Sequence, residues 1–319
     1  MVRYIIAITL ALLLLSACAD FTSGPRFKGD VYTIAGLLVA GQSISSEYPV
    51  YITRSADIES FDPMNIFVTE ADVRITETFE GEIIKTWNLR PIPDFVEFKI
   101  KWVDEAANVI LPEHTYHIEV SVPGYGKTIT AETTVPPAVE LNPDYYGHNV
   151  EGEGYSFTEA QMGYVVHSNS DTRYPLALNT GSRSETRNLV SELFCLEPFS
   201  TDLEFTTPVF GQTNASANLE DSYYGEGEGF RRVMIMGRFA PSIHPEHQDN
   251  YILVRNFRQG FIFYGRYRVK VYITDDNYYK YKYMSEGYLH GGVQNGLGYF
   301  GSASGGVMYV NVVKTAPAM

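Results

Sequence analysis

Cysteine and positive charge are both scarce in this sequence. Only two cysteines occur among 319 residues, Cys18 and Cys195. If Cys18 is used elsewhere, as argued below, no intrachain disulfide can form even in an oxidising compartment. Asp and Glu number 38 against 24 Lys and Arg, which gives a formal net charge of -14 at pH 7. Such an acidic surface argues against nucleic acid as a partner and against lying flat on anionic lipid.

A short apolar run opens the chain. It covers residues 4–15, directly after Arg3, and is too short for a comfortable transmembrane helix of about 20 apolar residues. It ends in Leu-Ser-Ala-Cys at residues 15–18, which resembles the bacterial lipobox. That resemblance implies cleavage before Cys18, whose thiol then carries a lipid, whereas an ordinary secretory signal with a chance cysteine is the alternative.

The lipobox sets the expected N-terminal organisation. Residues 1–17 form the signal peptide and residues 18–29 the lipidated tether. Acyl chains on Cys18 make the lipid bilayer the first expected partner, because each buried methylene contributes about 0.8 kcal/mol.

Alternating polar and apolar residues predict about seven short strands between residues 30 and 137. The strand candidates are 31–39, 48–54, 71–77, 82–89, 94–103, 115–122 and 127–134. Their number and spacing favour an immunoglobulin-like or fibronectin-like β-sandwich. Pro136 and Pro137 should end it, because proline cannot donate to a sheet.

Residues 138–154 are rich in Pro, Asn and Gly and predict a linker before a second β-rich domain, residues 155–319. Its strand candidates are 163–168, 203–207, 231–239, 251–257, 261–274 and 306–313. An amphipathic helix is expected from about residue 275 to 286, capped by Thr274, and a second, weaker helix candidate lies between 183 and 194. The predicted fold class is therefore mainly β with one or two short helices.

Four aromatic residues are possible ligand-facing groups. Tyr278 and Tyr281 lie on the predicted helix, and Trp87 and Trp102 on neighbouring strand candidates. Core packing is the expected role of all four, and a platform for stacking a ligand such as a sugar is the alternative. Cys195 sits among Leu193, Phe194 and Leu196, so we expect a buried thiol rather than a nucleophile.

Catalytic and metal-binding patterns are weak. The histidine pairs are His114 with His117 and His244 with His247, and neither has the helical spacing of a zinc protease. Acidic, glycine-rich loops contain Glu151, Glu153, Glu226 and Glu228, but they lack the register of a calcium-binding loop. No Gly-x-Ser-x-Gly elbow occurs, and nothing selects a carboxylate pair for glycoside hydrolysis. We therefore name no catalytic residue, leave any metal ligand undetermined and expect no cofactor.

Several segments together carry a family resemblance. Leu-Leu-Val-Ala-Gly at 37–41, Tyr-Ile-Thr-Arg-Ser-Ala at 51–56, Ala-Asp-Val-Arg-Ile-Thr at 71–76 and Tyr-His-Ile-Glu-Val at 116–120 follow the lipobox, and Asn-Gly-Leu-Gly-Tyr-Phe-Gly stands at 295–301. This pattern resembles a large family of Bacteroidetes-type outer-membrane lipoproteins catalogued as a domain of unknown function (domain of unknown function 4249). The resemblance implies an outer-membrane location, lipid-anchored, and a receptor of the TonB-dependent type as a possible partner.

The Asn-Gly pair at 295–296 also has a physical interpretation. It permits a tight turn with positive φ, and the small residues after it let backbone segments pack closely. A phosphate-binding role lacks the following helix and lysine.

These observations favour a cell-envelope lipoprotein that acts as a non-enzymatic binding or scaffolding accessory. A glycan-binding lipoprotein that uses exposed Tyr and Trp is the first alternative. An envelope hydrolase with an acidic dyad is the second.

Overall fold

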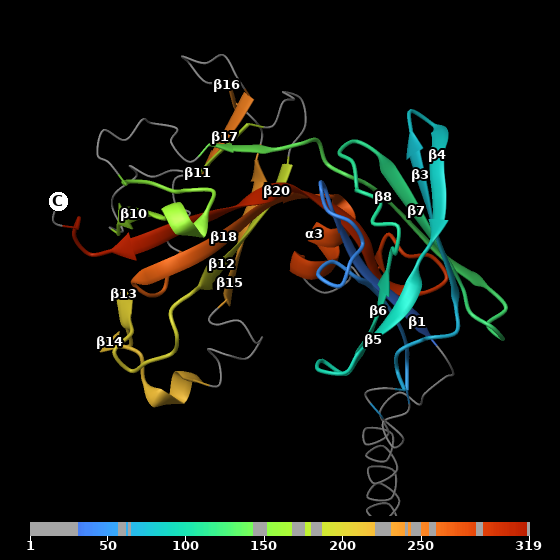
Figure 1. The fold of residues 1–319 in the computed structure, drawn as a ribbon, viewed down its shortest axis with the longest axis horizontal. Coiled ribbons are helices and arrows are strands. Elements are labelled where there is room, and N and C mark those ends of the chain that lie inside the picture. The colour runs from blue at the N-terminus through green and yellow to red at the C-terminus, as the bar shows by residue number, and fades with distance from the viewer. Residues whose placement is uncertain are drawn as a thin grey trace, which may run out of the picture.

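The described part of the protein is mainly β, with one short α-helix (Figure 1). The computed structural model describes residues 31–56, 62, 65–142, 152–167, 176–179, 187–220, 231–239, 242–243, 250–254, 260–284 and 290–317. Cys18 and the whole predicted tether lie outside the described residues. No helix within these ranges is long and apolar enough to cross a membrane.

A four-stranded antiparallel sheet has the strand order β4-β3-β7-β8. The strands are β3 (Asp72–Phe79), β4 (Glu82–Asn88), β7 (Thr115–Ser121) and β8 (Thr128–Thr134). Tyr116, Ile118 and Val120 of β7 point into the core at alternate positions, which is the period expected of a half-buried strand. All four confirm strands predicted from sequence, and β8 ends just before the two prolines.

The second sheet extends through the whole molecule, with the order β15-β12-β18-β20-β1-β2-β6-β5 and with β10 and β19 paired to β20. Its strands from the first half of the chain are β1 (Tyr32–Val39), β2 (Val50–Arg54), β5 (Arg90–Asp94) and β6 (Lys99–Val103). Those from the second half are β10 (Gly163–Val166), β12 (Arg187–Cys195), β15 (Arg231–Phe239), β18 (Gly265–Thr274), β19 (His290–Gly291) and β20 (Leu297–Val313).

Strand β20 belongs to both halves. Its first part pairs in parallel with β1, from Leu297 opposite Thr33, and its later part pairs antiparallel with β18. Phe300 accordingly lies in the core between β1 and the four-stranded sheet, whereas Met308 and Val310 lie in the core of the second half. The division at residues 138–154 stays a prediction about domain limits, but the sheet itself is continuous (Figure 1).

The predicted strand over residues 94–103 is confirmed only from Lys99 to Val103, as β6, and is wrong before Lys99. The chain turns back between β5 and β6, which pair antiparallel with Asp94 opposite Lys99. The hairpin could not be predicted from the sequence, because its turn contains Phe95, Val96 and Phe98 and no glycine or asparagine.

The predicted helices also need correction. Helix α3 (Asp276–Tyr283) is shorter than expected, and its N-cap is Asp275, not Thr274, because the Asp275 carboxylate accepts the Tyr278 amide hydrogen. No helix forms between residues 183 and 194 in the described part. That region contains β12 instead, which is paired on both sides, with β15 and β18.

The second half carries smaller sheets. One has the order β16-β17-β11-β9 and the other pairs β13 with β14. These strands are β9 (Glu140–Asn142), β11 (Leu176–Asn179), β13 (Glu204–Val209), β14 (Gln212–Asn214), β16 (Ser242–Ile243) and β17 (Asn250–Val254). Two 3-10 turns, η2 (Glu159–Gln161) and η3 (Ala217–Leu219), complete the described elements. The predicted linker thus contributes a strand, β9, and Cys195 at the end of β12 is fully buried, as expected.

The expected tight turn before the last strand is confirmed. Asn295 has φ 58°, and β20 starts two residues later, well before the predicted residue 306. Gly298 has φ 96°, and a Cβ there would lie 2.0 Å from the Ile34 carbonyl oxygen. Only glycine therefore lets β20 approach β1 at this point.

Candidate functional site

The two tryptophans belong to the core of the first half. Trp102 is 1% exposed, and its indole nitrogen donates to the Val68 carbonyl at 3.1 Å. Trp87 is half-buried and meets the Tyr116 ring edge-on, with centroids 6.3 Å apart. Burial of Trp102 favours core packing over ligand stacking for that residue.

The predicted tyrosines form part of a tyrosine face, which we define as Tyr278, Tyr281, Tyr283 and Tyr299. Tyr278 is buried, whereas Tyr281 and Tyr299 are half-buried, with ring centroids 5.1 Å apart and planes tilted by 39°. The Lys282 ammonium lies 5.1 Å from the Tyr299 ring centroid, and burial raises the pKa of Tyr299 to about 12.

The first turn of α3 connects the two sheets. Asp275 accepts the Thr133 hydroxyl hydrogen from β8 at 2.7 Å, and Thr133 also contacts the Ser302 hydroxyl of β20 at 2.7 Å. The Asn277 amide donates to the Glu132 and Phe300 carbonyls at 2.7 and 3.1 Å. These hydrogen bonds hold the helix in the seam where the four-stranded sheet meets β20.

The carboxylates at this seam have structural partners. Burial raises the pKa of Asp275, and the hydrogen bonds from Thr133 and from backbone amides oppose that shift. Asp276 accepts from the Asn188 amide at 2.8 Å and pairs with Lys280 at 2.8 Å. The neighbouring carboxylates of Asp275 and Asp276 therefore both have hydrogen-bond or ion-pair partners that hold α3 in place.

A cavity of about 400 Å³ opens at this seam. Its lining includes Glu113, Asn188, Thr274, Asp275 and Asp276, together with the segment from Thr134 to Pro137. Within the described ranges the buried Thr274 hydroxyl has no hydrogen-bond partner. The hydrolase alternative needs a pair of carboxylates in a cavity such as this one. A polar ligand or water could also form a hydrogen bond with the Thr274 hydroxyl.

His114 takes part in a polar network that sequence reasoning did not find. Its Nδ1 lies 2.7 Å from Glu77 Oε1, and the Tyr116 hydroxyl donates to the same oxygen at 3.2 Å. The Leu111 amide donates to the Tyr116 hydroxyl at 2.8 Å. Burial raises the pKa of Tyr116, so this hydroxyl stays protonated. The network fixes the loop before β7 onto β3.

Exposed apolar side chains also occur at the adjoining ends of β3 and β4 and in the loop before β7. We define the distal patch as Phe79, Ile83, Ile84, Val109 and Leu111. Ile83 is 70% exposed, and Phe79 stacks on the His114 ring at a centroid distance of 4.5 Å. Lys85 hydrogen-bonds to Asn108, which brings the loop carrying Val109 beside β4.

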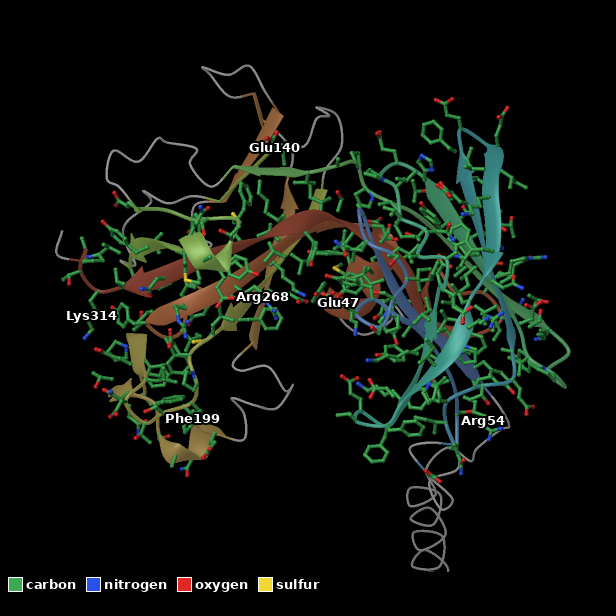
Figure 2. All side chains as sticks on the ribbon, in the orientation of Figure 1. Glu47, Arg54, Glu140, Phe199, Arg268 and Lys314 are labelled. Carbon is green, nitrogen blue, oxygen red and sulfur yellow. The ribbon has the colours of Figure 1, made fainter. Side chains whose placement is uncertain are left out.

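The distal patch also lies at a sheet edge. Among the described strands, β4 pairs only with β3, and Ile84 is the extra residue of a bulge between the Glu77–Lys85 and Thr78–Ile83 pairs. The turn between β3 and β4 is at the upper right of Figure 1, and Arg54, which Figure 2 labels, is at the lower end of the same half. Clustered exposed apolar groups mark interaction surfaces.

The remaining histidines and acidic loops lie only partly within the described residues. Across the described ranges, no group of three or more His, Cys, Asp or Glu could hold a metal ion. His117 lies 4.0 Å from Glu132 and takes no part in the His114 network. His244, His247, Glu151, Glu226 and Glu228 lie outside the described residues.

The fold and its surfaces define a mainly β protein with connected sheets, an apolar end and a polar seam. The chain belongs to the family described as domain of unknown function (DUF4249), whose match covers residues 27–306. No curated protein matches it.

Among solved structures, the chain is similar to Escherichia coli alpha-2-macroglobulin activated by porcine elastase, at 8% identity and a TM-score of 0.18. That similarity covers 78% of this chain and 19% of the other, so this chain spans about a fifth of that protein. A TM-score this low supports no argument about fold or function.

Proposed function

We propose that this chain is a cell-envelope lipoprotein, held in the outer membrane by a lipid on Cys18, that acts as a non-enzymatic binding or scaffolding accessory. The distal patch is the observation that carries this proposal. Ile83, Ile84 and Val109 are each more than half exposed, at 70%, 54% and 51%. Exposed apolar side chains that lie near one another are typical of surfaces that bind other proteins.

Hydrogen bonds and ring stacking next to the distal patch hold part of its surface in place before a partner binds. Glu77 accepts hydrogen bonds from Tyr116 and contacts His114, and Phe79 stacks on that histidine. Side chains that are already ordered lose little conformational entropy when a partner binds. The partner suggested by the family resemblance is an outer-membrane receptor of the TonB-dependent type.

The proposed architecture of the first half is an immunoglobulin-like or fibronectin-like sandwich. Two observations support it. The four-stranded sheet and the β1-β2-β6 part of the large sheet share one core. The Tyr116 hydroxyl, near the start of β7, accepts the amide hydrogen of Leu111 five residues upstream, which is similar to the tyrosine corner of such sandwiches. Loops at the ends of such a sandwich are common binding surfaces.

Site-specific photo-crosslinking tests the docking proposal. A benzophenone amino acid at Ile83 of the full-length chain, expressed in its native envelope, should capture one defined envelope protein. The matched control places the same group at Thr128, an exposed residue on β8 at the other edge of the same sheet. Equal capture from both positions, or none from Ile83, would contradict the proposal.

Glycan binding is the second candidate, and the tyrosine face is the observation that favours it. Tyr281 and Tyr299 leave part of their rings open beside the Lys282 ammonium. Aromatic rings of this kind can stack on a sugar, although the 39° tilt departs from a flat platform. A glycan array probed with the wild-type chain and with Tyr281→Ala separates the two candidates, because only glycan binding should be lost in the variant.

A further inference from the structure

The turn between β5 and β6 exposes three large apolar side chains. Phe95, Val96 and Phe98 are 76%, 89% and 61% exposed. They occupy a four-residue turn, because Asp94 and Lys99 form the last pair of the hairpin. Phenylalanines that are mostly exposed at a turn contribute little to burial in the fold, so the tip requires another explanation.

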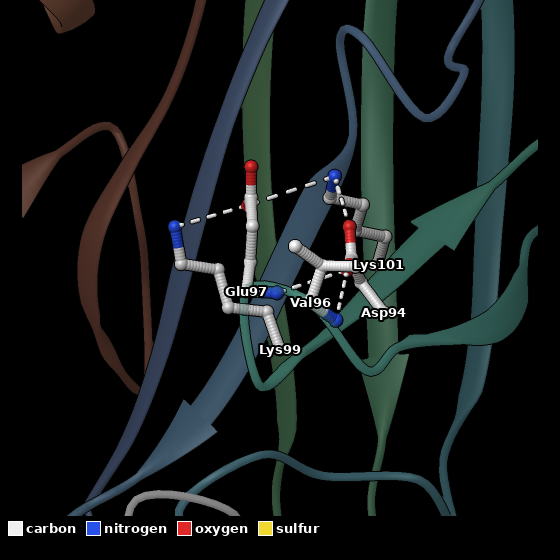
Figure 3. A network of polar contacts seen from close by, with 5 residues as sticks. All are labelled: Asp94, Val96, Glu97, Lys99 and Lys101. Atoms are coloured by element: carbon white, nitrogen blue, oxygen red, sulfur yellow. Dashed lines mark hydrogen bonds and ion pairs between the residues drawn. The ribbon is translucent and has the colours of Figure 1, made fainter. Parts of the chain in front are cut away.

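The turn is held in shape by a charged network (Figure 3). Asp94 accepts the amide hydrogens of Val96 and Glu97 at 2.9 and 3.0 Å, and its other oxygen accepts from Lys101 at 2.8 Å. The hydrogen bond from Lys101 and those from the amides lower the pKa of Asp94 to about 2. The tip is therefore ordered before any partner arrives.

The backbone at Phe98 adds to this picture. Its φ is 52°, in the left-handed region that favours glycine or asparagine. A bulky residue in that region costs about 1 kcal/mol or more, and such strain gathers at functional positions. The chain keeps a phenylalanine at a position where glycine would relieve the backbone.

The register places this tip at the end of the sheet where the chain enters the fold. Tyr32 of β1 lies opposite Arg54 of β2, and Val50 lies opposite Trp102 of β6. The start of β6 is therefore at the same end as the start of β1, two strands away, or about 10 Å at the usual strand spacing. Figure 1 shows the β5–β6 turn and the start of β1 at the lower end of the view.

The length of chain before β1 limits how far this end can stand from a bilayer. Twelve residues separate Cys18 from Val31 (residues 19–30). Even fully extended, this segment reaches at most about 45 Å. The β5–β6 tip thus lies at the end of the fold where the chain arrives from the proposed anchor, whereas the distal patch lies at the far end of the same half.

We propose that Phe95, Val96 and Phe98 insert into the interface of the bilayer that carries the Cys18 lipid, as a second membrane contact; this rests on the proposed lipidation. Three side chains at a convex tip are too small a surface for a stable protein interface of about 1,200 Å². They suit shallow insertion between lipid headgroups, where aromatic rings are favoured.

Local charge also permits this contact. Lys99 pairs with Glu97 at 3.2 Å, and Lys101 pairs with Asp94 at 2.8 Å. The two lysines balance the charge of the two carboxylates, so the tip has no local net charge from these four residues. Anionic lipid therefore repels the tip less than it repels the chain as a whole, whose net charge is -14. Two contacts, the lipid and the tip, would fix the orientation of the fold and direct the distal patch away from the membrane.

An environment-sensitive probe on the lipidated full-length chain tests the proposal. The nitrobenzoxadiazole fluorophore is attached to Val96→Cys, and to Ile83→Cys as the control at the distal end; buried Cys195 should escape labelling. After reconstitution into vesicles of phosphatidylethanolamine and phosphatidylglycerol, the Val96 probe should brighten several-fold and be quenched by shallow spin-labelled lipid. The Ile83 probe should stay accessible to aqueous iodide.

Flotation of the vesicles separates the possible failures. If the protein does not float with the vesicles, the lipid anchor fails and the tip contact falls with it. If it floats but the Val96 probe stays as accessible to iodide as the Ile83 probe, the tip contact alone is overturned. If the Val96 probe is shielded in native membranes but not in pure lipid, the tip binds a protein, which also overturns the proposal.

A second variant distinguishes an effect on folding from an effect on membrane insertion. Phe98→Gly relieves the left-handed backbone and should leave the urea midpoint equal or higher, while it lowers shielding of the Val96 probe. Unchanged shielding in a well-folded Phe98→Gly chain would exclude a role of this ring in the membrane contact.

Discussion

Removing the Tyr116 hydroxyl tests whether the network beneath the distal patch stabilises the fold. Tyr116→Phe keeps a ring that is 0% exposed and deletes one oxygen atom. That oxygen accepts the Leu111 amide hydrogen at 2.8 Å and donates to Glu77 at 3.2 Å. The substitution leaves a partly buried amide without its acceptor and a buried carboxylate with one donor fewer. The free energy of unfolding should fall by about 1–3 kcal/mol.

Equilibrium unfolding in urea, followed by tryptophan fluorescence, measures this change. The chain has only two tryptophans, and both pack in the core to which Tyr116 belongs. Tyr125→Phe is the matched control, because it deletes a hydroxyl that donates to the Asn295 carbonyl at 3.0 Å in an exposed position. That change should cost at most about 0.5 kcal/mol. A Tyr116→Phe chain no less stable than Tyr125→Phe would refute the reasoning.

Two further substitutions test the join between the halves. Gly298→Ala should lower the thermal midpoint by several degrees, because its Cβ would meet the Ile34 carbonyl oxygen at 2.0 Å, whereas Gly126→Ala, with open space around it, should have little effect. At Asp275 burial raises the folded-state pKa, so its contribution to stability is full below the unfolded pKa of about 3.9 and declines as the pH rises through the folded pKa. Asp275→Asn should remove that decline, and urea midpoints measured from about pH 4 to 7 would show an unchanged slope if Asp275 were not its source.

The sequence predicted those strands that bury one face. The segment 115–122 shows a clear period of two, and β7 follows it, with Tyr116, Ile118 and Val120 inside. Strand β12 was missed because it carries Ser191 and Glu192 at its centre and because residues 188–191 and 193–195 are all buried. A strand in that position has no solvent face to produce an alternating pattern.

The join between the halves could not be predicted from local sequence. The β1–β20 pair links residues such as Thr33 and Leu297, and no short-range pattern encodes a contact between positions so far apart. The same limit applies to the network of Glu77, His114 and Tyr116, which meets only once β3 and β7 pair. The β5–β6 tip had a signal, the apolar residues between Asp94 and Lys99, but they suggested a continuous strand.

Detergent phase partition tests most directly the proposal that a lipid on Cys18 holds this chain in the envelope. The full-length wild-type chain, expressed in a bacterium that processes lipoproteins, should enter the detergent phase and the membrane fraction. Cys18→Ser should move to the aqueous phase with an unchanged urea midpoint, because the substitution removes only the proposed lipid attachment site. A Cys18→Ser chain that stays fully in the detergent phase would contradict the account.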